Sequence, residues 1–98
     1  MNFKLVFTSE ARGQLAELER TPARAKQFRA VRKTLGLLET NLRHPSLKTH
    51  EFHSLRGVAD EKVFEAYAEN RTPSALRVFW HYGPSKAQIT IVAITPHP

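Results

Sequence analysis

The spacing of hydrophobic and polar positions changes near the middle of the chain. An alternating stretch at residues 2–7 predicts a strand, and apolar residues at helical spacing over residues 9–20 predict a helix. A second helix is predicted from Pro22, with Thr21 as its N-cap, to about Leu42. Because only a short turn separates the two segments, they are expected to form an antiparallel helical hairpin.

The second half of the chain is predicted to consist of strands. Turn residues separate four short segments rich in β-branched and aromatic residues: HEFHSL, KVFEAYAE, ALRVFWHY and AQITIVAI. The last segment is apolar at both alternating sets of positions, which predicts a strand that is central or covered by the helices. The predicted fold is therefore α+β, with an N-terminal strand, a helical hairpin and a three- to four-stranded antiparallel sheet packed on the helices. Residues 1–98 are expected to form a single domain, since no repeat or linker divides them.

Composition excludes several classes of site. The 98 residues contain no cysteine, which rules out a disulfide framework, a thiol nucleophile and a cysteine–zinc site. The N-terminal stretch lacks the apolar region of a signal peptide, and no apolar run approaches the ~20 residues needed to cross a bilayer. A cytoplasmic protein with no membrane partner is expected.

Positive charge points to an anionic partner. Fifteen Lys and Arg against nine Asp and Glu give a net charge of +6, which is typical of small domains that bind nucleic acid. In the second predicted helix, Lys26, Arg29 and Lys33 fall on the face opposite the leucine stripe. That face is either a phosphate-contacting surface or an ordinary solvated face.

A second basic set in the strand half combines cations with flat side chains. Its cations are Lys48, Arg56, Arg71 and Arg77, and they alternate along the sequence with His50, Phe52, His53, Tyr67 and Tyr82. RNA grooves use arginine for phosphates and aromatic rings for bases. Cleavage also needs a group that removes the proton of a 2′-hydroxyl and one that protonates the leaving 5′-oxygen, tasks that suit histidine or a carboxylate.

Four segments resemble a known family: PSLKTHEFHSLRG (Pro45–Gly57), VFEAY, ALRVFWHYG and ITIVAITPHP. With the chain's size, charge and order of elements, they make it similar to the RelE/ParE superfamily of toxins from bacterial toxin–antitoxin systems. Many members are ribosome-dependent, metal-independent endoribonucleases that cut mRNA, whereas a ParE-like branch inhibits DNA gyrase. The resemblance implies a cognate antitoxin partner, mRNA in the ribosome as substrate, and no metal or other cofactor.

The resemblance also assigns residues. Arg77 corresponds to a phosphate-binding arginine and His97 to a near-terminal histidine that acts as acid or base, while Lys48, Arg56 and Arg71 match basic positions of the groove. Tyr82, from the basic and aromatic set described above, is expected to stack on a nucleic-acid base.

The acid–base set departs from the family pattern. Glu65 and Tyr67 stand where some ribonucleases have lysines, and the chain ends in His97-Pro98 rather than histidine-tyrosine. Further acid–base candidates are Glu51, His50 and His53. Three hypotheses follow: an mRNA-cleaving toxin, which we favour, a gyrase inhibitor, and a basic nucleic-acid-binding domain without catalysis.

Overall fold

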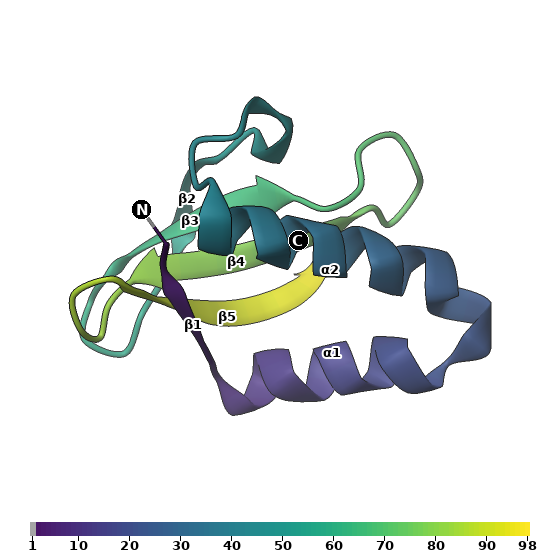
Figure 1. Ribbon diagram of the computed structural model, residues 1–98, viewed down its shortest axis with the longest axis horizontal. Coiled ribbons are helices and arrows are strands. Elements are labelled where there is room, and N and C mark those ends of the chain that lie inside the picture. Colours follow the sequence, from purple (N-terminus) through teal and green to yellow (C-terminus); the bar gives the residue numbers. More distant parts are fainter. Residues whose placement is uncertain (1) are drawn as a thin grey trace.

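The computed structural model describes residues 2–98, and its elements follow the order expected from the sequence (Figure 1). Their bounds are β1 (Lys4–Phe7), α1 (Ser9–Arg20), α2 (Ala25–Thr40), β2 (His50–Arg56), β3 (Lys62–Tyr67), β4 (Leu76–Tyr82) and β5 (Gln88–Pro96), with 3-10 turns at Pro22–Arg24 and Pro45–Leu47. The α+β class and the helical hairpin are confirmed.

The second helix is shorter than predicted. Pro22 opens a 3-10 turn instead of the α-helix, which begins only at Ala25. Thr21 makes no side-chain N-cap hydrogen bond, because its hydroxyl donates to the carbonyl oxygen of Glu17 at 2.6 Å. The α-helix ends at Thr40, two residues before the predicted end.

Thr8 fixes the first helix to the sheet. Its Oγ1 accepts a hydrogen bond from the backbone N–H of Ala11 at 3.1 Å and donates one to the carbonyl oxygen of Val92 at 2.7 Å. One hydroxyl therefore caps the N-terminus of α1 and joins it to β5.

Replacing Thr8 with alanine is expected to lower the free energy of unfolding by about 1–2 kcal/mol, the upper part of the range for a lost N-cap, because the bond to β5 is lost as well. Urea unfolding measures this loss. Thr8→Ser keeps the hydroxyl and serves as the control, so equal losses in both variants would contradict the role given to the hydroxyl.

The sheet has five strands in the order β1-β5-β4-β3-β2, one or two more than predicted, and it is mixed rather than wholly antiparallel. β1 pairs in parallel with β5, from Lys4 opposite Gln88 to Phe7 opposite Ile91, and the other neighbours are antiparallel. β5 is thereby bonded on both sides, which confirms the prediction drawn from its apolar character.

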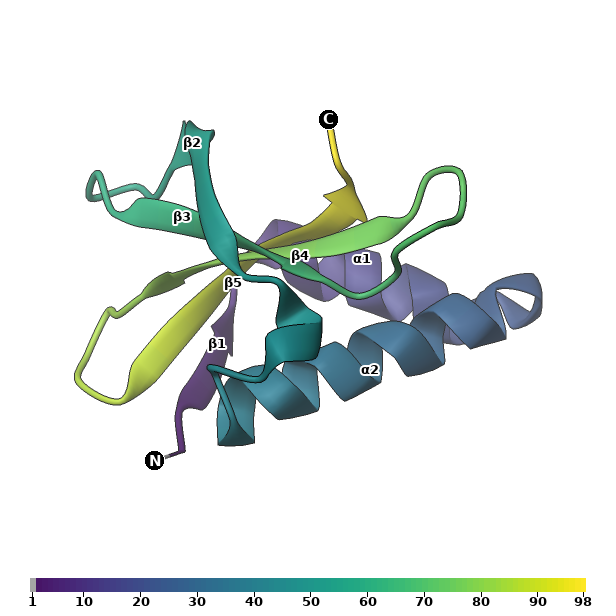
Figure 2. The same cartoon turned by 90° about the horizontal axis from the view of Figure 1, so that it is seen from above.

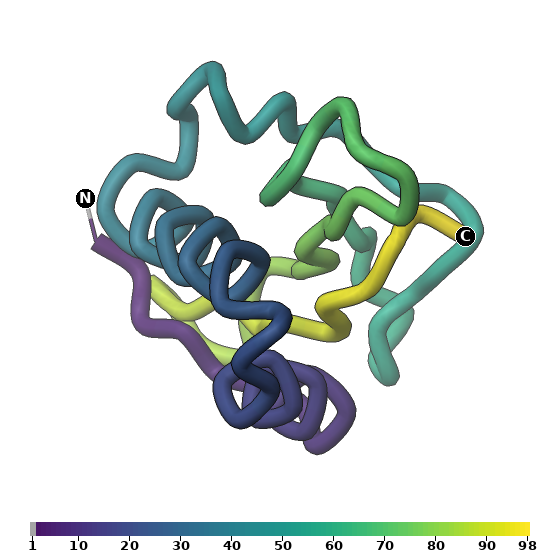
Figure 3. The backbone as a smooth tube through the Cα atoms, turned by 90° about the vertical axis from the view of Figure 1, so that its right-hand side faces the viewer, coloured from purple at the N-terminus to yellow at the C-terminus, as the bar shows by residue number. Residues whose placement is uncertain are grey.

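The two faces of the sheet have different surroundings. Both helices pack on one face, called the helix face, while β2 curls over the other, called the open face, and the C-terminus projects from it (Figures 2 and 3). The main core fills the helix face, with Leu18, Leu38, Val78 and Ile91 fully buried. A smaller cluster of Val63, Phe79 and Ala93 packs with Phe52 and Leu55 on the open face. None of the helices in residues 2–98 has the length and apolar character needed to cross a membrane.

Candidate functional site

A buried carboxylate lies at the centre of the polar groups on the open face. Glu65 of β3 is 1% exposed, and its oxygens contact three side chains from different elements. Oε1 lies 2.8 Å from Nε2 of His50, and Oε2 lies 2.6 Å from Nδ1 of His97 and 3.6 Å from Nε of Arg77. With Tyr67, these four residues are called the Glu65 cluster.

The strand register brings this cluster together. β3 lies between β2 and β4, with His50 directly opposite Glu65 and Arg77 directly opposite Tyr67. Because side chains alternate between faces, Glu65 and Tyr67 share the open face. His97 follows the end of β5 and reaches the carboxylate from the other side of β4.

Arg77 is held tightly inside the cluster. Its side chain is only 11% exposed, and its guanidinium carbon lies 3.7 Å from the centre of the Tyr67 ring. Nη1 donates to the carbonyl oxygen of Glu69 at 2.6 Å, while Nε is buried without a hydrogen bond. The guanidinium balances the charge of Glu65, since an unpaired carboxylate would be costly to bury.

The two histidines differ in what they can offer a substrate. Nε2 of His50 contacts Glu65 and its Nδ1 lies 2.9 Å from the carbonyl oxygen of Lys48, so both ring nitrogens are in use. His97 uses only Nδ1, and within residues 2–98 its Nε2 has no hydrogen-bond partner. Its ring is 53% exposed and meets the Phe52 ring edge-on at 5.5 Å, which orients the imidazole. His97 is therefore the histidine with a nitrogen available for proton transfer.

Lys48 is the predicted groove cation that lies next to the cluster. Its backbone carbonyl oxygen lies 2.9 Å from Nδ1 of His50, and its Nζ lies 5.6 Å from the centre of the Tyr67 ring. Arg71 lies on the exposed loop between β3 and β4, where its side chain makes no ion pair within the described residues.

Two other predicted residues on β2 have different partners. Glu51 lies 3.3 Å from His53, and Arg56, at the far end of the strand, lies 3.7 Å from Asp60. Neither side chain contacts Glu65. In the part of the chain that the structure describes, no group of three or more His, Cys, Asp or Glu is arranged to hold a metal ion.

The remaining predicted residues lie on the helix side. Tyr82 is on β4 with Arg77, but it packs against Trp80 and Phe64, whose partners are in the core of the helix face. The three predicted cations of α2 are exposed: Lys26, Arg29 and Lys33. This helix lies on the other side of the sheet from the end of β5 (Figure 2). The structure thus brings together Lys48, His50, Arg77 and His97.

The sequence matches no protein-family model and no curated protein. Solved structures do match it over nearly the whole chain. A YoeB/ParE toxin from Agrobacterium tumefaciens has a TM-score of 0.71 at 14% identity, with 98% of this chain and 100% of that chain covered. The RelE of an archaeal RelE–RelB complex from Pyrococcus horikoshii OT3 has a TM-score of 0.65 at 15% identity, with 98% and 96% covered. A chain of the YoeB dimer from Staphylococcus aureus has a TM-score of 0.65 at 12% identity, with 100% of this chain and 100% of that chain covered.

The chain has the RelE/ParE toxin fold. Within this RelE/ParE fold, sequence reasoning missed the central position of Glu65 and the stacking of Tyr67 on Arg77. One signal for Glu65 was available, because it follows two apolar residues and precedes Ala66 in a predicted strand. A lone acid in such a strand is expected to be buried with a partner.

Proposed function

We propose that this chain is the toxin of a toxin–antitoxin system and that it cuts mRNA on the ribosome without a metal ion. The observation that carries the proposal is His97, which is anchored at Nδ1 by the buried Glu65 and whose Nε2 has no partner within residues 2–98. Arg77 contacts the same carboxylate, and both Arg77 and Lys48 lie near the Tyr67 ring. The fold and the net charge of +6 support the same proposal.

The proposed chemistry is a transfer within the RNA chain. The 2′-oxygen attacks the neighbouring phosphorus and the bond from phosphorus to the 5′-oxygen breaks, which leaves a 2′,3′-cyclic phosphate and a 5′-hydroxyl. His97 gives the proton on Nε2 to the departing 5′-oxygen, while Glu65 orients the imidazole through Nδ1. Lys48, with Arg77 behind it, stabilises the charge that grows on the phosphate.

The proposed dependence on the ribosome is based on the hydrogen bonds of His50. The proton of the 2′-hydroxyl also needs an acceptor, and both nitrogens of the second histidine, His50, already have partners. The ribosome, which holds mRNA in a fixed conformation, is proposed to supply this acceptor and the alignment for attack. Free RNA is therefore expected to be cut far more slowly than mRNA in ribosomes.

A protein partner is part of the proposal. One structural neighbour was solved as a RelE–RelB complex. We propose an acidic antitoxin for this chain, because electrostatic complementarity to a basic surface makes association fast and selective.

Primer extension on a defined mRNA in programmed ribosomes tests the proposal. New 5′ ends within the decoding site are expected with the wild-type chain, and Lys48→Gln is expected to slow their appearance about tenfold, the value of one lost charged contact. Lys86→Gln removes an exposed cation from the turn between β4 and β5 and is the matched control. Equal rates for both variants would contradict the phosphate role of Lys48.

A second candidate is a nucleic-acid-binding domain without catalysis. It is favoured by the burial of Arg77, whose Nη1 is already bonded to the chain's own Glu69 carbonyl. In that case RNA would bind in a strongly salt-dependent way and no new 5′ ends would appear. Uncut mRNA together with inhibited DNA supercoiling would instead support the gyrase-inhibitor hypothesis.

A further inference from the structure

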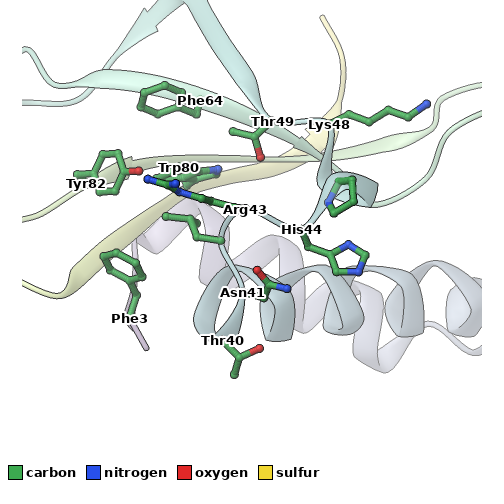
Figure 4. Close-up of a pocket in the computed structure, with 12 residues that line it drawn as sticks. Phe3, Thr40, Asn41, Arg43, His44, Lys48, Thr49, Phe64, Trp80 and Tyr82 are labelled. Carbon is green, nitrogen blue, oxygen red and sulfur yellow. The ribbon is translucent and has the colours of Figure 1, made fainter. Parts of the chain in front are cut away.

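A pocket on the helix face shares only Lys48 with the proposed cleavage site. It opens between the end of α2, the segment 41–49 and the strands β3 and β4, and its volume is about 720 Å³ (Figure 4). Its lining includes the aromatic rings of Phe3, Phe64, Trp80 and Tyr82, and the Arg43 side chain extends toward Trp80 and Tyr82 (Figure 4).

The aromatic wall is ordered by contacts among its own rings. Phe64 and Trp80 are stacked with centres 5.0 Å apart, and Tyr82 meets the Trp80 ring edge-on at 5.0 Å. Phe3 lies 6.1 Å from Tyr82. Tyr82 is 51% exposed in spite of these contacts, so part of its ring can receive another flat group.

Trp80 provides a buried hydrogen-bond donor with no acceptor. The residue is 1% exposed, and its Nε1 has no partner within the described residues. A buried donor left without an acceptor costs about 1–3 kcal/mol, and native proteins keep few of them. Trp80 lines the pocket, so this N–H is an unsatisfied donor in the pocket wall.

The charges around the pocket select an anion. Within residues 2–98 no acidic side chain lines it, whereas Arg43 does and forms no ion pair there. Lys48 also lines it, but its ammonium group lies near the Tyr67 ring of the Glu65 cluster. His44 also lines it, but its Nδ1 is held by Ser46 at 2.7 Å. The pocket therefore combines a flat apolar wall, one unused donor and one unpaired cation.

We propose that this pocket binds a nucleotide, with the base against Tyr82 and the phosphate at Arg43. A base offers a flat ring and acceptor atoms for Trp80 Nε1, and the pocket volume lies within the 300–1,000 Å³ or so of typical ligand sites. An acidic peptide would match the cation but not the flat wall. The nucleotide is free or part of an RNA chain, and the site lies on the opposite face of the sheet from His97, so it goes beyond the proposed cleavage.

Fluorescence tests the proposal directly, because Trp80 is the chain's single tryptophan. The full chain is titrated separately with AMP, UMP, inorganic phosphate, a short single-stranded RNA and an acidic peptide. Saturable quenching is expected with the nucleotides and the RNA. Tighter binding of RNA than of AMP assigns the site to an RNA chain, and equal binding assigns it to free nucleotides.

Three variants make the test specific. Tyr82→Leu is expected to weaken AMP binding about five- to a hundredfold, the value of one stacked base. Arg43→Gln is expected to weaken it about tenfold through loss of the phosphate contact, whereas Arg20→Gln, which removes an exposed cation at the end of α1, leaves it unchanged. The single indole N–H signal in NMR gives a second readout and shifts when Nε1 gains an acceptor.

Three results would overturn the proposal. The first is fluorescence and an indole signal that stay unchanged at millimolar nucleotide. The second is binding of phosphate as tight as that of AMP, which would mean that the base adds nothing. The third is an acidic peptide that binds more tightly than every nucleotide and displaces AMP.

Discussion

Replacing His97 with alanine is expected to slow mRNA cleavage on the ribosome by about 10²- to 10⁴-fold, the usual contribution of a positioned acid or base. The expected cause is loss of the proton donor for the 5′-oxygen. His97 is half exposed and follows the end of β5, so the fold is expected to persist. The rate is measured by primer extension and the fold by circular dichroism.

His53→Ala is the matched control for this prediction. His53 is also an exposed histidine on the strand half of the chain, but its partner is Glu51 and it does not contact Glu65. Cleavage by this variant is expected to stay within about twofold of wild type, as for surface substitutions away from a site. A folded His97→Ala protein that cuts as fast as wild type would remove His97 from the mechanism.

Replacing Glu65 with alanine is expected to lower the free energy of unfolding by about 3–5 kcal/mol, the cost of breaking a buried ion pair by removing one partner. The substitution leaves the guanidinium of Arg77 nearly nine-tenths buried with no carboxylate beside it. It also removes the anchors of His50 and His97. Urea unfolding measures the loss, and cleavage is expected to fall together with stability.

Two variants separate charge from other effects. Glu65→Gln keeps the volume of the side chain and is expected to lose most of the same stability, because the missing charge leaves Arg77 unpaired. Glu51→Ala removes a glutamate that also pairs with a histidine, but on a more exposed site, and is expected to cost at most about 1 kcal/mol. Equal losses for Glu51→Ala and Glu65→Ala would contradict the central role of Glu65.

The periodicity of the sequence predicted most of the fold, because long amphipathic helices and alternating strands leave clear local patterns. The place of β1 was not predicted. A strand of four residues that pairs in parallel with a distant strand leaves no local sign of its partner. The late start of α2 was also missed, since a proline after a threonine opens a 3-10 turn and an α-helix equally well.

Some of the candidate residues chosen from the sequence lie together in the structure. Arg77 and His97 were selected by the resemblance to the family, and in the structure both side chains contact the carboxylate of Glu65. The carboxylate was noticed only as a departure from the family pattern, because its partners come from strands whose register cannot be read locally. Tyr82 was grouped with Arg77 although the two are five positions apart on one strand, a spacing that favours opposite faces.

The pairing of the first strand with the last sets the order in which a newly made chain can fold. The hydrogen bond from Thr8 to Val92 spans 84 residues, and β5 follows every other element along the sequence. The apolar stripes of α1 and α2 therefore leave the translating ribosome long before the strands that cover them. Until β5 is complete, the nascent chain exposes its helical hairpin and has no assembled Glu65 cluster, so synthesis itself is expected to delay any activity of the proposed site.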